Sequence, residues 1–148
     1  MPEAVSALCR IPVALSQNVT VLDKSGAHAT VFLGPDRVPE VSRIPACANH
    51  QDLSASIDPP ASASRSVQRQ KTALRVLEDS STTLATLAAS FLTAPIYSRN
   101  AAAPTVYSAV YRPAELRVDY LWPGKVMTQR IGWFEPGEYV HDYGPLSR

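Results

Sequence analysis

Two blocks of strand-like sequence flank a stretch with helical periodicity, and this order constrains the fold more than any other feature. The first block, residues 19–44, is rich in β-branched and apolar residues separated by turn sequences such as Asp23-Lys24-Ser25-Gly26. The second block, residues 106–122, alternates in the manner of a hairpin. Because the strands and helices are segregated along the chain, we predict a layered α+β fold.

We expect a short helix and a three-stranded antiparallel meander in the first third of the chain. Residues 2–10 place apolar side chains at helical spacing after a proline, which is tolerated in the first turn. Strands are expected at residues 19–22, at residues 29–33 and near residues 38–44. Apolar residues occur on both faces of these strands, so the sheet is predicted to be covered on each side.

Two amphipathic helices in the middle of the chain are predicted to cover one face of a sheet. Residues 51–64 are rich in Ser, Ala, Asp and Pro and are interpreted as a loop, within which residues 58–60 open the first helix. Ser80 or Ser81 is expected to cap the second helix, and Pro95 to end it. The apolar stripes are Ala63, Val67, Leu74 and Leu77 in the first helix and Leu84, Leu87, Ala88, Phe91 and Leu92 in the second.

The last third of the chain is predicted to contain a β-hairpin followed by an irregular tail. Residues 106–111 and 116–122 are the two expected strands. Pro123-Gly124 is interpreted as a break, and residues 129–134 as a further short strand. The tail from residue 135 onward shows no clear period.

Composition limits the classes of partner that this chain is expected to bind. The 148 residues carry 14 lysines and arginines against 13 carboxylates, so the net charge does not attract nucleic acid or an anionic membrane. No apolar run approaches the ~18 residues needed to span a bilayer, and no signal peptide is visible. These patterns favour a cytoplasmic location. The three histidines are far apart and the two cysteines form no zinc pattern, so neither a metal nor a cofactor is expected.

Several conspicuous residues are assigned structural roles. Asn18 belongs to a formal glycosylation sequon, but it is interpreted as part of a paired strand. Asp23 is interpreted as a turn residue. The aromatic side chains of Trp122, Tyr107 and Tyr111 are expected to pack within or between layers.

Four stretches share their order and spacing with a known family of enzymes. These are residues 16–32, Ala48-Asn49-His50-Gln51, residues 105–113 and residues 120–124. Through them the chain resembles the autoproteolytic acyltransferase/hydrolase family around isopenicillin-N acyltransferase, which is related to the choloylglycine hydrolases and penicillin V acylases. The resemblance extends from about residue 4 to residue 143, and it corresponds to the later portion of such a protein.

The resemblance implies part of a four-layer αββα sandwich of the N-terminal-nucleophile (Ntn) type, with residues 1–148 as a single partial domain. In this family a Gly-Cys bond cleaves itself, and the freed cysteine supplies both a thiol nucleophile and an α-amino base. An α-amine has a pKa of ~7.7–8.0, which suits proton transfer near neutral pH. The chain opens Met1-Pro2-Glu3, so we expect the nucleophile to lie outside it and the chain alone to be inactive.

The resemblance also implies two site residues. Asn49 matches an asparagine that donates a hydrogen bond to the oxyanion formed during attack on an amide carbonyl. Arg69 best matches an arginine early in the following helix, where positive charge favours the thiolate; Arg65, one turn earlier on the same side, is the alternative. Without the resemblance, Asn49 is interpreted as a loop residue bonded to its own backbone, and the arginines as a solvated helix face.

Three functional hypotheses follow from these residues. The leading one is the later part of an amide (C–N) hydrolase or acyltransferase that acts on a small acyl amide and is completed by a nucleophile-bearing portion. The alternative is a non-catalytic remnant that serves as a binding or structural module or as a subunit of a homo-oligomer. A third hypothesis is a thiol enzyme using Cys47 and His50. It is disfavoured because the two side chains point apart in an extended segment, and Cys9 and Cys47 are instead predicted to be small buried hydrophobes.

Overall fold

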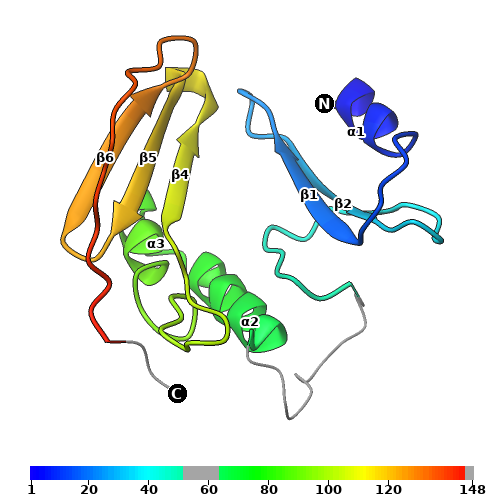
Figure 1. Cartoon of the computed structure of the whole chain (residues 1–148). Helices are drawn as coiled ribbons and strands as arrows, with labels where there is room; N and C mark the ends of the chain where they lie inside the picture. Colours follow the sequence, from blue (N-terminus) through cyan, green and yellow to red (C-terminus); the bar gives the residue numbers. More distant parts are fainter. Residues whose placement is uncertain (52–63, 146–148) are drawn as a thin grey trace.

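The computed structural model describes residues 1–51 and 64–145, which form two separate antiparallel sheets together with helices (Figure 1). This arrangement confirms the predicted α+β class. The strands are β1 (Gln17–Leu22), β2 (His28–Leu33) and β3 (Glu40–Ser42) in one sheet, and β4 (Ser108–Arg112), β5 (Arg117–Trp122) and β6 (Lys125–Arg130) in the other. The helices are α1 (Pro2–Leu8), α2 (Ser66–Glu78), α3 (Leu84–Ser90) and the 3-10 turn η1 (Pro113–Glu115).

The first sheet is the predicted meander, with β2 at its centre. β2 pairs with β1 through matches such as Asn18 opposite Phe32, and with β3 through Thr30 opposite Ser42. Every residue of β2 from Ala29 onward is buried. β1 and β3 are only partly covered, so the prediction of a sheet buried on both faces holds for the central strand alone.

The turn between β1 and β2 is built by Asp23, as the sequence predicts. Its Oδ1 accepts hydrogen bonds from the Ser25 hydroxyl at 2.6 Å and from the Ser25 backbone N–H at 2.9 Å. These two hydrogen bonds hold the pKa of Asp23 below its ordinary value, with the hydroxyl as the larger cause. Gly26 follows with φ of +87°, a conformation that favours glycine.

The helix α2 begins later than predicted. Its N-cap is Arg65, which has a left-handed backbone (φ +44°), so a right-handed helix cannot continue through this residue. The expected opening at residues 58–60 and the expected stripe residue Ala63 lie outside the described residues. Arg65 does lie one turn before Arg69, because its carbonyl accepts the Arg69 N–H at 3.0 Å, but it does so as the N-cap and not as a residue of the helix.

The cap of α3 also differs from the prediction. Thr83, in place of Ser80 or Ser81, accepts the Thr86 backbone N–H at 3.2 Å, and the Thr86 hydroxyl in turn accepts the Thr83 N–H at 2.8 Å. Ser81 is engaged elsewhere, since both its N–H and its hydroxyl donate to the carboxylate of Asp79. This turn delays the helix until Leu84.

The second sheet contains the predicted hairpin, but its third strand starts earlier than expected. Pro123-Gly124 is a two-residue turn, because Trp122 pairs directly with Lys125 across it. Gly124 adopts φ of +75°, which fits the second central position of a turn with proline at the first. Pro123-Gly124 is therefore a turn between two paired strands and not the break that the sequence predicts. The strand expected at residues 129–134 is also corrected, because β6 runs from Lys125 to Arg130.

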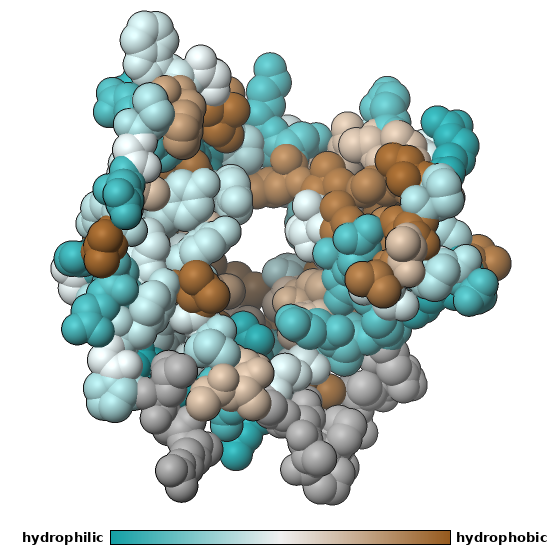
Figure 2. Space-filling view, in the orientation of Figure 1, coloured by the Kyte–Doolittle hydropathy of each residue, from teal (hydrophilic) through white to brown (hydrophobic). Residues whose placement is uncertain are grey.

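The two sheets stand apart, with β1 and β4 as the edge strands that face each other (Figure 1). The space-filling view shows an opening through the molecule between them (Figure 2). The buried apolar residues lie mainly in β2 and in β5. The others are Val67 and Ala73 of α2, and Ile96 and Tyr97 between α3 and β4 in the sequence. The described part of the chain is thus consistent with a partial Ntn-type sandwich.

Candidate functional site

The candidate site is centred on residues 46–51, an irregular segment that follows β3. Asn49 and Arg69, the two preferred residues from the sequence, line the same cavity of about 250 Å³. Its other walls are largely apolar and come from α2, α3 and the segment after α3. They include Ala73, Leu77, Leu87, Phe91 and Ile96. A cavity of this composition pairs one neutral donor and one cation with an apolar lining.

The side chain of Asn49 is an unused hydrogen-bond donor. The residue is exposed, and within the described part of the chain its side-chain amide makes no hydrogen bond. The structure therefore does not support the interpretation of Asn49 as a loop residue bonded to its own backbone. Its two N–H groups are free to bind another molecule.

Arg69 lies at the end of the first turn of α2 and is held in place by one hydrogen bond. Its Nε donates to the carbonyl oxygen of Ile96 at 3.1 Å. Burial of the guanidinium lowers its pKa from the ordinary value, but an arginine remains charged at any physiological pH. No carboxylate in residues 1–51 or 64–145 forms an ion pair with Arg69, so its charge is available to the cavity. Arg65, the alternative, is exposed and does not line this cavity.

Asn18 is a site residue that the sequence analysis missed. It lies on β1, and its side-chain nitrogen donates to the carbonyl oxygens of Ala48 at 2.5 Å and His50 at 3.2 Å. Its side-chain oxygen accepts a hydrogen bond from Gln51. Asn18 thus binds the backbone on both sides of Asn49. No local pattern reveals this role, because the partners lie about thirty residues further along the chain.

A second hollow of about 440 Å³ lies next to the same segment. It is bordered by residues 16–18 and Thr20 of the β1 region, and by residues 47–49 and Gln51. Residues 47–49 line both this hollow and the smaller cavity. These three residues therefore form a wall that the two hollows share.

The geometry does not favour a thiol enzyme built from Cys47 and His50. Burial is the main cause that raises the pKa of the Cys47 thiol, against the effect of hydrogen bonds from Asn18 and Thr30. The Cys47 Sγ–H points to the carbonyl of Ala48 at 3.4 Å, while His50 Nδ1 lies 3.3 Å from the hydroxyl of Ser66. Cys47 and Cys9 are both free and only half-buried, which corrects the expectation that they are buried hydrophobes.

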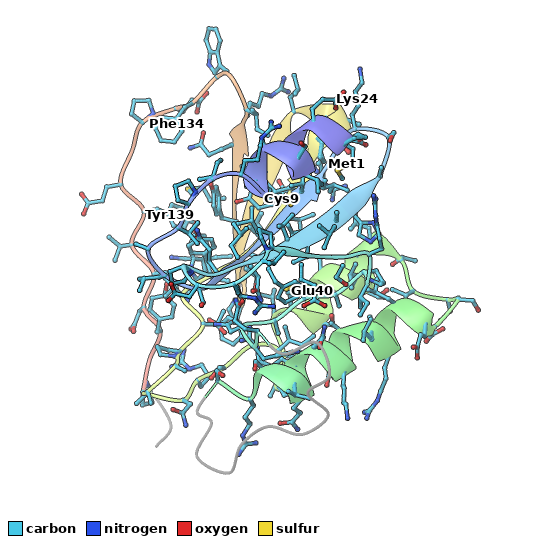
Figure 3. All side chains as sticks on the ribbon, turned by 90° about the vertical axis from the view of Figure 1, so that its right-hand side faces the viewer. Met1, Cys9, Lys24, Glu40, Phe134 and Tyr139 are labelled. Carbon is cyan, nitrogen blue, oxygen red and sulfur yellow. The ribbon has the colours of Figure 1, made fainter. Side chains whose placement is uncertain are left out.

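The aromatic residues of the second sheet pack mainly against the tail. Trp122 is 8% exposed and stacks on Tyr139 with ring centroids 5.3 Å apart. Its Nε1 donates to the carbonyl of Val106 at 2.9 Å. Tyr107 lies against Trp122 and Tyr120, whereas Tyr111 is 58% exposed and does not take the packing role predicted for it. Figure 3 shows the tail as a strand-like path, with Phe134 and Tyr139 along it, on the side of the molecule away from the α2 helix.

The described residues show neither a metal-binding cluster nor a membrane-spanning helix. No group of three or more His, Cys, Asp or Glu side chains converges in residues 1–51 and 64–145. In the same residues, no helix is long and apolar enough to cross a bilayer.

The chain was compared with protein families, curated proteins and solved structures. A family model described as acyl-coenzyme A:6-aminopenicillanic acid acyl-transferase matches residues 1–126. This range includes Asn18, Asn49 and Arg69 and leaves out the tail that packs on Trp122. No curated protein and no solved structure matches the chain.

Proposed function

The chain belongs to the acyl-coenzyme A:6-aminopenicillanic acid acyl-transferase family, and we propose that it forms the oxyanion-binding part of a cysteine Ntn amide hydrolase or acyltransferase. Family membership supports an acyltransferase/hydrolase type of chemistry. The observation that carries the proposal is the shared cavity of Asn49 and Arg69. Residues 1–148 then act as one partial domain that a nucleophile-bearing portion completes.

In this proposal Asn49 acts on the carbonyl oxygen of a small acyl amide. A thiol adds to the carbonyl carbon, its proton passes to the α-amine beside it, and the carbonyl oxygen becomes an oxyanion. The Asn49 amide donates a hydrogen bond to this oxyanion. Collapse of the intermediate expels the amine, which takes up the proton and leaves a thioester. Water or a second amine then accepts the acyl group.

Arg69 has an electrostatic role in the same proposal. A positive charge beside a thiol favours the thiolate, which is the attacking form. The half-buried position of Arg69 reduces screening by water, so its charge acts more strongly than it would at the surface. Since Nε is fixed by Ile96, the rest of the guanidinium can be directed to the cavity.

We place the nucleophile outside these 148 residues because neither thiol in the chain is suited to attack. The pKa of Cys47 is raised by burial, and its neighbour His50 is bonded to Ser66. Cys9 is the C-cap of α1 and directly follows the last residue of this short helix (Figure 3). Neither residue is positioned as a base-activated thiol.

The alternative function, a binding or structural module, is favoured by a different observation. Many large apolar side chains are exposed, with Val38 at 86% and Leu15 at 78%. β1 and β4 also present unpaired edges beside the opening in Figure 2. Exposed apolar patches and strand edges are typical of surfaces that bind another chain.

The deciding experiment compares amide cleavage by the native assembly that contains this chain with cleavage by the 148-residue chain alone. We expect the chain alone to be inactive and the native assembly to release amine from acyl-amide substrates. In the assembly, Asn49→Ala should lower kcat by about 10²–10³-fold, as loss of one oxyanion donor does. Cys9→Ser serves as a control that retains activity, because Cys9, the C-cap of α1, lies outside both cavities. An inactive native assembly would favour the binding module.

A further inference from the structure

We infer that Asn18 is a positioning residue that fixes the Asn49 donor from the opposite strand. This inference rests on the proposed function of Asn49. The side-chain nitrogen of Asn18 donates to the carbonyl groups of residues 48 and 50, which are the two neighbours of Asn49. It also lies 3.4 Å from the sulfur of Cys47. The amide therefore holds the backbone on each side of the donor and leaves the donor itself unbound.

The side-chain oxygen of Asn18 fixes the orientation of the amide group. A side-chain amide can rotate to exchange its nitrogen and oxygen, which would turn an acceptor toward the carbonyls of residues 48 and 50. The hydrogen bond from Gln51 to the Asn18 oxygen opposes this rotation. Both ends of the amide thus have partners in the same segment, and only one orientation satisfies all of them.

Asn18 is itself held in place by its pairing with β2, in which every residue from Ala29 onward is buried. Asn18 pairs with Phe32 across the β1–β2 ladder, and Phe32 is 2% exposed. On the other side of the segment, Gln70 of α2 donates to the carbonyl of Ala46 at 2.9 Å. Residues 46–50 are therefore anchored to both the first sheet and α2. Such anchoring is what a preorganised oxyanion donor requires, because it adds no reorganisation during the reaction.

Loss of a positioning residue lowers the reaction rate, whereas loss of a residue that only stabilises the fold lowers the free energy of unfolding. Without the two donated hydrogen bonds, residues 48–50 gain freedom while the β1–β2 ladder remains paired. The Asn49 amide then spends less time where the oxyanion forms. A misplacement of about 1 Å is enough to reduce a rate by roughly 10²-fold, so the effect should fall on kcat and leave KM nearly unchanged.

The test uses Asn18→Val, which removes the donors and keeps a residue that favours strands, and Asn18→Asp, which keeps the shape and removes the donors. Leu22→Thr is the matched control on the same face of β1, since Leu22 is exposed and borders neither the larger hollow nor the smaller cavity. In the 148-residue chain, NMR order parameters at Asn49 should fall from about 0.85 to below 0.6 in both Asn18 variants. They should stay unchanged in Leu22→Thr, and hydrogen exchange in β2 should stay slow throughout.

The second part measures kcat and KM in the native assembly. We expect both Asn18 variants to lower kcat by about 10–10²-fold at nearly constant KM. Unchanged order at Asn49 in both variants would overturn the inference whatever the activity. If Asn49→Ala lowers kcat and the Asn18 variants do not, the inference fails and the proposed function stands. If Asn49→Ala itself has no effect, the proposed function fails and the role of Asn18 in catalysis fails with it.

Discussion

Asn49 and Arg69 illustrate how differently two residues of one cavity are held. Arg69 is fixed by its own side chain through Ile96, whereas the Asn49 side chain makes no hydrogen bond in the described part of the chain and is placed only by its backbone. Removing the Asn49 amide should therefore leave the fold intact.

We expect Asn49→Ala to change the free energy of unfolding of the 148-residue chain by less than about 0.5 kcal/mol. Urea unfolding followed by circular dichroism would measure the change. Arg69→Ala is the matched comparison in the same cavity, and loss of its bond to Ile96 should cost about 1–2 kcal/mol. A large loss of stability in Asn49→Ala would show that the residue has a structural role after all.

A pH-dependent contribution to stability is expected at Asp119. This nearly buried carboxylate accepts the Thr128 hydroxyl at 2.7 Å, as well as hydrogen bonds from Arg112 and Arg117. The Thr128 bond is the main cause that holds the pKa of Asp119 below its ordinary value. A lowered pKa stabilises the fold above the unfolded value of ~3.9, and this contribution is lost as the pH falls through the folded pKa.

Thr128→Val should therefore cost about 1–2 kcal/mol of unfolding free energy at pH 7 and clearly less near pH 3. Urea titrations at the two pH values would measure the difference. Thr72→Val is the control, because its hydroxyl donates to a neutral carbonyl and its cost should not depend on pH. An equal cost for Thr128→Val at both pH values would contradict the role of the Asp119 charge.

At the scale of elements, the cap of α3 gives a direct comparison between prediction and structure. Thr83→Ala removes both the N-cap oxygen and one half of the capping box. It should destabilise the chain by about 1 kcal/mol, which thermal unfolding would detect. Ser80→Ala, at a position predicted from sequence to be a cap, should have no measurable effect. Equal effects of the two variants would indicate that the helix starts earlier in solution.

The sequence predicts elements well where the signal is local. The strands of the meander and the hairpin follow from alternation and β-branched residues, and they lie within a few residues of their predicted bounds. The predicted ends of helices and strands are wrong where two local rules favour different positions. Several residues in a row can cap α3, and only the turn made by Asp79 and Ser81 selects Thr83. Pro123-Gly124 suits both a break and a tight turn, and pairing of β6 decides between them.

The candidate site is predictable only in part. Asn49 and Arg69 come from the resemblance to a family, and the structure brings them to one cavity. Asn18 has no local signature, because its role depends on hydrogen bonds to residues about thirty positions away. Arg65 lies one turn before Arg69 but does not line the cavity, because it is a left-handed N-cap outside the regular helix, which periodicity cannot reveal.

At the scale of the whole molecule, the two sheets have separate cores, facing unpaired edges and an opening between them (Figure 2). Several large apolar side chains are also strongly exposed, including Trp133, Phe134 and Val140. We expect the isolated 148-residue chain to self-associate, because association covers these surfaces. Sedimentation velocity over a range of concentrations should show assemblies larger than a monomer. A monomer at every concentration would contradict this expectation.

The wall formed by residues 47–49 has a consequence for regulation. Because the same three residues border two hollows, a molecule that displaces this wall to fit one hollow reshapes the other. The two hollows then form a coupled pair of sites, and thermodynamic linkage requires the coupling to be reciprocal. An occupant of the larger, polar hollow would change the affinity of the smaller cavity for its ligand, and that ligand would change the affinity of the larger hollow by the same factor.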